Sequence, residues 1–222
     1  RGAEITRSMP PGHINAIFIE NADSLDRADW RMAVKNASEQ GAFIFYNHPG
    51  FPDPKGNPLW GPDHESLFQE KLLHGVEVVN SREYYANSQE WCLEKKMTMI
   101  ASSDQHPPIE QTFDAAGGDH RPVTIVFAKK RTPEAIREAL FARRTAAWSE
   151  NTVIGEEKYL RPIFDESCEV TTPKLTIRGK GSAYIQIRND SDVTFELNAP
   201  GDSEFVTRSE EHTSELQSPN TI

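Results

Sequence analysis

The sequence Met97-Thr-Met-Ile-Ala-Ser-Ser-Asp104-Gln-His106 joins a short apolar run to a carboxylate and an imidazole. The run has the composition of a buried β-strand, and Asp104 and His106 stand two positions apart, which places both side chains on the same side of an extended chain. Residues at the carboxyl ends of neighbouring parallel strands converge, and barrels of strands and helices build metal sites in this way. The stretch therefore predicts a metal site if other strands also end in metal-binding residues.

Three other apolar runs carry such a residue, namely Gly2-Ala-Glu4-Ile-Thr, Gly12-His13-Ile-Asn and Phe43-Ile-Phe-Tyr-Asn47-His48-Pro49. Each residue alone has an ordinary structural explanation, because Asp104 could cap a helix or a turn and Asn-His-Pro is a common turn sequence. His106 could likewise be a solvated loop residue. It is their combination at strand ends that favours a metal site.

Strand-like and helical patterns alternate along most of the chain. Strands are expected at 14–20, 42–46, 76–79, 97–102, 122–128 and 145–148, and helices at 28–40, within 63–74, within 87–96 and from Thr132 onward. Apolar strands that alternate with helices indicate a parallel sheet that helices cover. The expected fold class is α/β, and the expected architecture over residues 1–161 is a (β/α) barrel.

The pattern changes after about residue 161. Segments 169–172, 174–178, 183–188 and 193–197 alternate apolar and polar residues, with glycines and an Asn-Asp turn between them. This alternation is typical of half-buried antiparallel strands. We expect residues 162–207 to form the start of a small antiparallel β domain of sandwich type, since so few strands seldom close a core.

Residues 208–222 are polar and have neither a strand nor a helix period, which predicts a disordered tail. Their sequence also resembles the in-frame translation of a sequencing-adapter oligonucleotide. The segment is therefore expected to be foreign to the gene, and His212 to be no metal ligand. An ordinary flexible terminus is the alternative.

Deleting residues 208–222 is expected to leave the thermal midpoint of unfolding unchanged, because this composition cannot bury enough apolar surface to order itself. Thermal melts of the two lengths of chain measure the effect. A clear drop in the midpoint on deletion would show that the tail packs on the rest of the protein.

The chain has 222 residues and a net charge of -10, from 24 Lys and Arg against 34 Asp and Glu. This acidity argues against a nucleic-acid partner, because binding to phosphate backbones needs clustered basic residues. No apolar run is long enough to predict a membrane span, and no leader peptide is visible. Cys92 and Cys168 are not spaced as a metal or disulfide motif and are expected to be inert. The sequence leaves the compartment open.

The motifs Ser-Asp-x-His, Asn-His-Pro and a Glu followed nine residues later by a His resemble the later motifs of the polymerase and histidinol phosphatase (PHP) family of metal hydrolases. Segments 2–13 and 120–128 are similar to a branch of bacterial PHP phosphodiesterases that act on organophosphate esters. The resemblance implies an incomplete, distorted PHP-type barrel that lacks its first strands. It also implies a divalent-metal-dependent phosphoesterase, chiefly a phosphodiesterase of small-molecule phosphate esters, in which a metal-bridging hydroxide attacks phosphorus.

By the same resemblance, Glu4 bridges metal ions, and His13 and His48 complete the binding of one ion. Asp104 would bind a second ion and His106 a third. The ions would be Mn or Zn, with up to three in the intact family site. The early His-x-His motif of the family is absent from this sequence, which implies about one ion or fewer in the chain and impaired activity.

Two arginines are candidates for binding the phosphoryl group, because a guanidinium matches phosphate oxygens. They are Arg7, three residues after Glu4, and Arg144, just before the last expected barrel strand. A solvated surface position is the alternative for each.

Several other residues near these motifs receive weaker predictions. His64 and His74 flank an expected helix and should lie at the surface, whereas His120 starts a strand and should be structural. Four loop aromatics could line an apolar ester pocket or could simply pack locally, namely Phe51, Trp60, Tyr84 and Tyr85.

Two alternative functions stay open on the sequence. A catalytically inactive PHP-like barrel that serves as a binding or interaction module would tolerate the missing ligands. A histidinol phosphatase or a polymerase-associated exonuclease would share the site but not the β domain that follows.

Overall fold

The computed structural model describes residues 1–8, 11–51, 53–171 and 185–191, with the single residues 176, 178 and 195. The chain divides into two compact units, Arg1–Ser191 and Asp192–Ile222. Within the second unit the description is confined to Phe195. The elements below therefore belong to the first unit.

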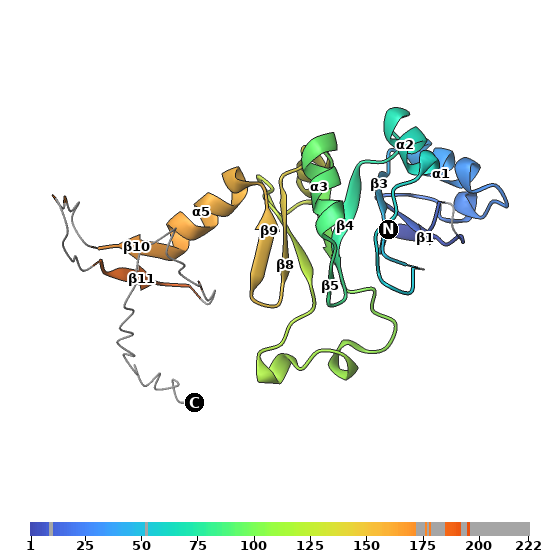
Figure 1. Cartoon of the computed structure of the whole chain (residues 1–222). Helices are drawn as coiled ribbons and strands as arrows, with labels where there is room; N and C mark the ends of the chain where they lie inside the picture. The colour runs from blue at the N-terminus through green and yellow to red at the C-terminus, as the bar shows by residue number, and fades with distance from the viewer. Residues whose placement is uncertain are drawn as a thin grey trace, which may run out of the picture. The chain divides into compact units, whose positions relative to one another are not determined.

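A six-stranded mixed sheet forms the centre of this unit (Figure 1). Its strands are β1 (Gly2–Ile5), β2 (Ile14–Ile17), β3 (Phe43–Tyr46), β4 (Gly75–Asn80), β5 (Glu83–Tyr84) and β6 (Thr98–Ser102). They pair in the order β1-β2-β3-β4, and β4 also pairs with β6 and with the short β5. The parallel pairing of β3, β4 and β6 confirms the prediction drawn from the alternation of strands and helices.

The first three strands, in contrast, pair antiparallel. The connection from β1 to β2 spans only residues 6–13, and a parallel pair needs a crossover of about a dozen residues or more. The short connection therefore requires the antiparallel arrangement. The register sets Glu4 opposite Asn15, which brings Glu4 close to His13, the residue just before β2.

Helices lie on both faces of the central sheet. The helices of the described chain are α1 (Trp30–Glu39), α2 (Pro62–Gln69), α3 (Ala86–Lys95), α4 (Pro133–Phe141) and α5 (Glu157–Ser167), with short 3-10 turns η1 (Asp23–Leu25), η2 (Ile109–Gln111) and η3 (Ala115–Gly117). Of these, α5 packs against strands that lie outside the central sheet. The start of α4 is as predicted, because Thr132 Oγ1 accepts a hydrogen bond from Ala135 N at 3.3 Å and Pro133 occupies the first turn.

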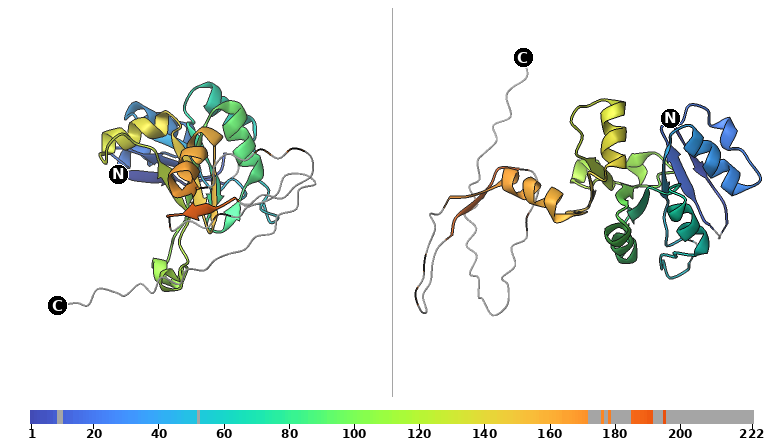
Figure 2. Two further views of the ribbon diagram at one scale, coloured as in Figure 1. Left: turned by 90° about the vertical axis from the view of Figure 1, so that its left-hand side faces the viewer. Right: turned by 90° about the horizontal axis from the view of Figure 1, so that it is seen from above.

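Strand β3 is buried along its whole length. Successive side chains of a strand point to opposite faces, and those of β3 enter two different hydrophobic clusters. Ile44 packs in the cluster that contains Val34 of α1, whereas Phe43 packs with Leu140 of α4. The right-hand view of Figure 2 shows α3 and α4 on opposite sides of the strands. Burial on both faces explains the continuous apolar sequence of β3.

A three-stranded antiparallel sheet follows, made of β7 (Val123–Val126), β8 (Thr145–Ser149) and β9 (Thr152–Gly155). Two threonine hydroxyls join it to β6. Thr124 Oγ1 accepts from Ala101 N and donates to Ala101 O, both at 2.9 Å, and Thr145 Oγ1 donates to Met99 O at 2.9 Å. No strand pairing continues from β6 into this sheet in the described part of the chain. The architecture shown is mixed α/β, and a closed barrel is not shown.

Two elements in this region were not predicted. Strand β9 extends the β7-β8 pair, and α5 contains Pro162 in its interior. Proline disfavours a helix interior, so the sequence did not suggest a helix that runs across residue 161.

A separate two-stranded antiparallel sheet, β10 (Cys168–Val170) with β11 (Ile187–Asn189), agrees with the predicted change to antiparallel strands. The strands expected at 174–178 and 193–197 fall outside the described residues, except at positions 176, 178 and 195. Among the described residues, none of the helices has the length and apolar character needed to cross a membrane.

Candidate metal centre

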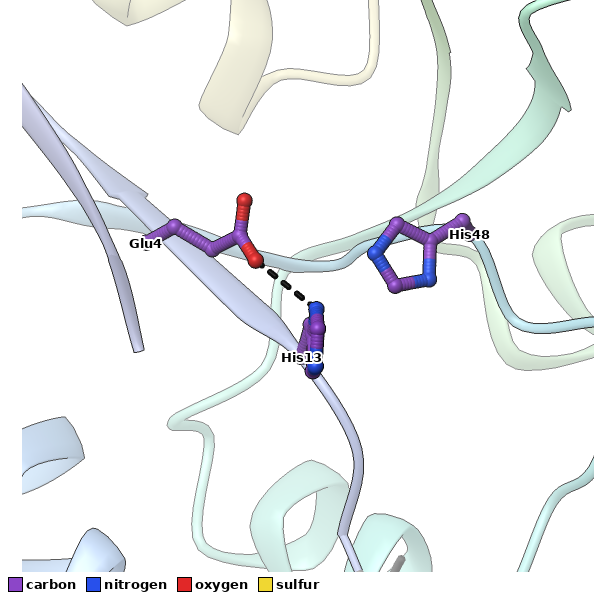
Figure 3. Close-up of side chains that lie close together, drawn as sticks. All are labelled: Glu4, His13 and His48. Carbon is purple, nitrogen blue, oxygen red and sulfur yellow. Dashed lines mark ion pairs between the residues drawn. The ribbon is translucent and has the colours of Figure 1, made fainter. Parts of the chain in front are cut away.

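Three predicted ligands converge at one end of the central sheet. Glu4 lies on β1, His13 directly precedes β2 and His48 follows β3 by two residues. One potential ligand atom from each lies within 4.8 Å of the others. Figure 3 shows the Glu4 carboxylate pointing toward the two imidazole rings. The structure thus brings together residues that are up to 44 positions apart in the sequence.

Backbone pairing accounts for this convergence. The ladder between β2 and β3 pairs Ile14 with Tyr46, and Asn47 N extends it by donating to His13 O at 3.0 Å. His13 and His48 therefore lie side by side, with ring centroids 4.6 Å apart. The backbone of His48 has a φ of 24°, in the left-handed region that non-glycine residues seldom occupy.

The donor set suits a divalent cation. His13 Nδ1 lies 2.8 Å from Glu4 Oε1, and His48 Nδ1 is buried without a hydrogen-bond partner in the described part of the chain. Burial lowers the pKa of His13 below its usual value, and the neighbouring His48 acts in the same direction. Neutral imidazoles with one carboxylate are ligands that Zn²⁺ and similar ions accept. The residues present fit such an ion.

Asp104 and His106 reach the same cavity but not the group of three. The cavity has a volume of about 680 Å³ and is lined by Glu4, Thr6, His13, His48, Phe51, Asn80, Ser81, Arg82, Glu83, Tyr85, Asp104 and His106. The Asp104 side chain is 30% exposed and that of His106 is 82% exposed. His106 Nδ1 lies 2.7 Å from Asp104 O. All five predicted ligands therefore share one cavity, in which three are close enough to bind one ion.

Three of the eight non-glycine residues with positive φ angles in the described part of the chain line this cavity. Besides His48, the lining residues Ser81 and Asp104 have positive φ angles of 54° and 49°. Residues held in such conformations cost free energy and cluster at functional sites. The strain supports the choice of this cavity as the functional site.

No family model matches the chain, and no curated protein matches it significantly. Among solved structures, a two-domain protein from Bacteroides vulgatus, which contains a predicted PHP-like metal-dependent phosphoesterase, matches with a TM-score of 0.79 and 42% sequence identity. The chain is similar to a PHP-like protein. The match covers 86% of this chain and 55% of the Bacteroides protein, so the chain spans about half the length of that relative. The similarity supports the PHP family predicted from the motifs, while the organophosphate branch stays a prediction.

The two arginines predicted to bind phosphate do not line the cavity. Arg7 donates to the backbone oxygens of Thr6, at 2.6 Å, and of Arg27. Arg144 forms an ion pair with Glu138 and donates to Phe127 O at 3.0 Å. Both guanidinium groups are held away from the candidate ligands.

Arg82 lines the cavity instead, and the sequence analysis missed it. Its Nη2 lies 2.5 Å from Asp119 Oδ2, and its guanidinium group lies 4.9 Å from the ring centroid of Phe113. Asp119 raises the pKa of Arg82 further above its usual value, so the group is cationic. A usable signal was present, because Arg82 follows the expected strand 76–79 in the way that His48 follows the strand 42–46.

The loop aromatics divide into two groups. Phe51 and Tyr85 line the cavity, whereas Trp60 packs on Trp91 at 5.3 Å between ring centroids and Tyr84 is exposed. His120 contacts Trp148 and Glu150 O, in keeping with the structural role expected of it.

The expectation that His64 and His74 lie at the surface is wrong. His64 is fully buried, with Nε2 2.6 Å from Pro11 O and Nδ1 accepting from Gly61 N at 3.0 Å. His74 Nδ1 accepts from Ile44 N at 3.0 Å. Both rings satisfy backbone groups that would otherwise be buried unpaired, a role that helix periodicity does not reveal.

His64→Ala is expected to lower the free energy of unfolding by about 3 kcal/mol near pH 7.5, because it removes a buried ring and two hydrogen bonds. Burial lowers the pKa of His64 in the folded protein. Its contribution is therefore complete above the ordinary histidine pKa of about 6.5 and is lost as the pH falls through the lower folded value. Urea unfolding near pH 7.5 and near pH 5 measures the difference.

The exposed His106 supplies the control for this experiment, since His106→Ala should change the unfolding free energy by less than about 0.5 kcal/mol. An effect of His64→Ala that is the same at both pH values would contradict the neutral, buried state of His64.

Proposed function

We propose that the chain carries part of the catalytic centre of a divalent-metal-dependent phosphoesterase, and that its substrates are small-molecule phosphodiesters. The observation that carries this proposal is the convergence of Glu4, His13 and His48, together with the buried His48 Nδ1, which lacks a hydrogen-bond partner in the described part of the chain. The similarity to a PHP-like metal-dependent phosphoesterase supports it.

In this proposal Glu4, His13 and His48 hold one ion, Mn²⁺ or Zn²⁺. When bound, the ion supplies Lewis-acid chemistry toward the phosphoryl group. Asp104 and His106 add a carboxylate and an imidazole on another part of the cavity wall and would serve further ions or the reacting water. The catalytic unit is proposed to be a PHP-type barrel over 1–161, followed by a β domain over 162–207 and a tail over 208–222.

Arg82 is proposed to bind the phosphoryl group, in the role that the sequence suggested for Arg7 and Arg144. It is the only lysine or arginine that lines the described cavity, in which the carboxylates of Glu4, Glu83 and Asp104 also lie. A substrate that carries negative charge needs a compensating cation in such a setting. The cavity is otherwise bounded by Phe51 and Tyr85, which offer apolar surface to an ester group.

Arg82→Met is expected to raise the KM for an aryl phosphodiester about tenfold or more, because it removes charge-assisted hydrogen bonds to the phosphoryl oxygens. Zinc affinity should stay the same, since Arg82 is not in the ligand group. Steady-state kinetics of the longest protein that the gene encodes, together with a zinc titration, measure the two effects. Arg7→Met is the matched control, and an equal rise of KM in both variants would contradict the role of Arg82.

The proposed activity is tested by assaying the same protein, with and without added Mn²⁺ or Zn²⁺, against an aryl phosphodiester, a phosphomonoester and DNA. Metal-dependent hydrolysis of the diester in preference to the other two is expected. Inactivity toward all three would favour a binding module, and a preference for the monoester or for DNA would replace the diester assignment.

A further inference from the structure

Glu77 is a carboxylic side chain in the middle of the central sheet. It lies on β4 between Val76 and Val78, is fully buried, and is the only aspartate or glutamate in the buried class among the described residues. A strand flanked by parallel neighbours on both sides normally carries apolar residues. A buried carboxyl group at this place therefore calls for a specific explanation.

The carboxyl group of Glu77 lies beside the ends of three parallel strands. Its Oε2 accepts from His48 N at 2.7 Å and from Asn80 Nδ2 at 2.9 Å. The nearby side chain of Ser102 favours the charged form of the carboxyl group. His48 follows β3, Asn80 ends β4 and Ser102 ends β6. The carboxyl group thus lies directly behind the wall of the cavity and touches the backbone of one metal-ligand candidate.

An irregularity in the sheet accompanies this arrangement. The pairing of β4 with β6 shifts between Glu77 and Val79, so that β4 has one extra residue opposite β6. Bulges of this kind redirect side chains and are frequent beside active sites. The bulge occurs where Glu77 must reach the loop that follows β3.

The backbone of His48 depends on this contact. Its φ of 24° is strained, and its N–H is directed to Glu77 Oε2. A strained backbone conformation persists only where contacts with the surrounding structure hold it in place. The buried carboxylate supplies a strong acceptor at this point and thereby fixes the direction in which the imidazole leaves the chain.

If Glu77 only stabilised the fold, both of its carboxyl oxygens would be expected to accept hydrogen bonds. Glu77 Oε1 is buried and has no hydrogen-bond partner in the described part of the chain. An unpaired buried oxygen is destabilising, and apolar residues of similar volume often replace buried charged groups without loss of stability. The hydrogen bond to His48 N gives the carboxyl group a role that an apolar residue could not fill.

We propose that Glu77 is a positioning residue that sets the metal affinity of the site by holding the His48 backbone. The proposal rests on the metal-dependent function proposed above. Groups behind a metal ligand that orient it commonly change metal affinity by about tenfold to a hundredfold when they are removed. Glu77 itself is not a ligand in this account.

The test compares zinc affinity and thermal stability in Glu77→Gln, Glu77→Asp and Glu77→Met, with the full chain in metal-free form titrated with zinc chloride. Gln keeps an acceptor oxygen for His48 N, so its zinc Kd should stay within about threefold of the wild type. The Met side chain offers no acceptor to His48 N, and the shorter Asp side chain places its oxygens one methylene farther from that N–H. Both substitutions should weaken zinc binding about tenfold or more. If the Met variant does not fold, the zinc Kd of the Asp variant tests the proposal.

Val34→Ala controls for general destabilisation, because Val34 is fully buried on α1 and is not among the residues that line the cavity. Its thermal midpoint should fall while its zinc Kd stays unchanged. A zinc Kd within threefold of wild type in both the Asp and the Met variants would overturn the proposal, as would an equal weakening in Val34→Ala.

A second readout separates this proposal from the proposed function. If the wild-type chain bound no zinc, the metal-dependent function would fail, and the backbone amide proton signal of His48 in the metal-free proteins would decide the role of Glu77. Loss of the hydrogen bond in the Met variant should move this signal upfield, while Gln should leave it nearly in place. An unchanged signal in the Met variant would overturn the positioning role.

Discussion

His48→Ala is expected to reduce metal-dependent hydrolysis of an aryl phosphodiester about a thousandfold or more, because it removes a ligand and leaves the ion poorly held beside the substrate. Asp104→Asn should be comparably severe. Asparagine keeps the shape of Asp104 but lacks the negative charge that offsets a divalent cation. The measurement is turnover by the longest protein that the gene encodes, with and without added Mn²⁺ or Zn²⁺.

The histidine control should be a residue that the sequence predicts to be no metal ligand. His64 and His74 do not serve, since both rings are hydrogen-bonded to backbone groups and His64 is fully buried. His212→Ala, in the segment predicted to be foreign to the gene, should leave turnover within about twofold. Activity near the wild-type level in Asp104→Asn would show that Asp104 has no part in catalysis.

Glu4→Gln is expected to weaken zinc binding about a hundredfold, because it removes the only carboxylate from the group of three ligands. The amide oxygen of glutamine is a weaker, uncharged donor, so charge compensation is lost while the side-chain volume is kept. Competition with a chromogenic zinc chelator measures the change. Glu20→Gln, an exposed glutamate three residues beyond β2, should leave the affinity unchanged, and equal losses in both variants would point to a nonspecific acidic surface.

Much of the local structure was predictable because the signals are short-range. The cap at Thr132 followed by Pro133, the apolar runs of β3, β4 and β6, and the periodicity of α1 each depend on neighbouring residues. The grouping of Glu4, His13 and His48 was also predictable. Several residues that can bind metal stand beside strand-like runs, and the ends of neighbouring strands converge in such a fold.

The features that sequence analysis missed depend on long-range partners. The buried ring of His64 forms hydrogen bonds with the backbone of Pro11 and of Gly61. Arg82 reaches the cavity while bound to Asp119, 37 residues further along the chain. Helical or strand periodicity carries no information about such contacts.

The role of Glu77 also depends on a residue that is distant in the sequence. The apolar pattern of residues 76–79 correctly predicted a strand, but it assigns no role to the carboxyl group of Glu77 within that strand. Its meaning depends on the N–H of His48, which a crossover of 29 residues brings beside it. The antiparallel pairing of β1 to β3 was missed for a related reason, since strand direction is set by connection length and not by strand composition.

The central claim is that Glu4, His13 and His48 bind a divalent ion. Calorimetric titration of the metal-free chain with zinc chloride tests it most directly, in parallel with the double variant His13→Ala/His48→Ala. We expect about one ion or fewer per wild-type chain and no binding at the same zinc concentrations in the double variant. Zinc binding of equal affinity in the two proteins, or none in the wild type, would contradict the account.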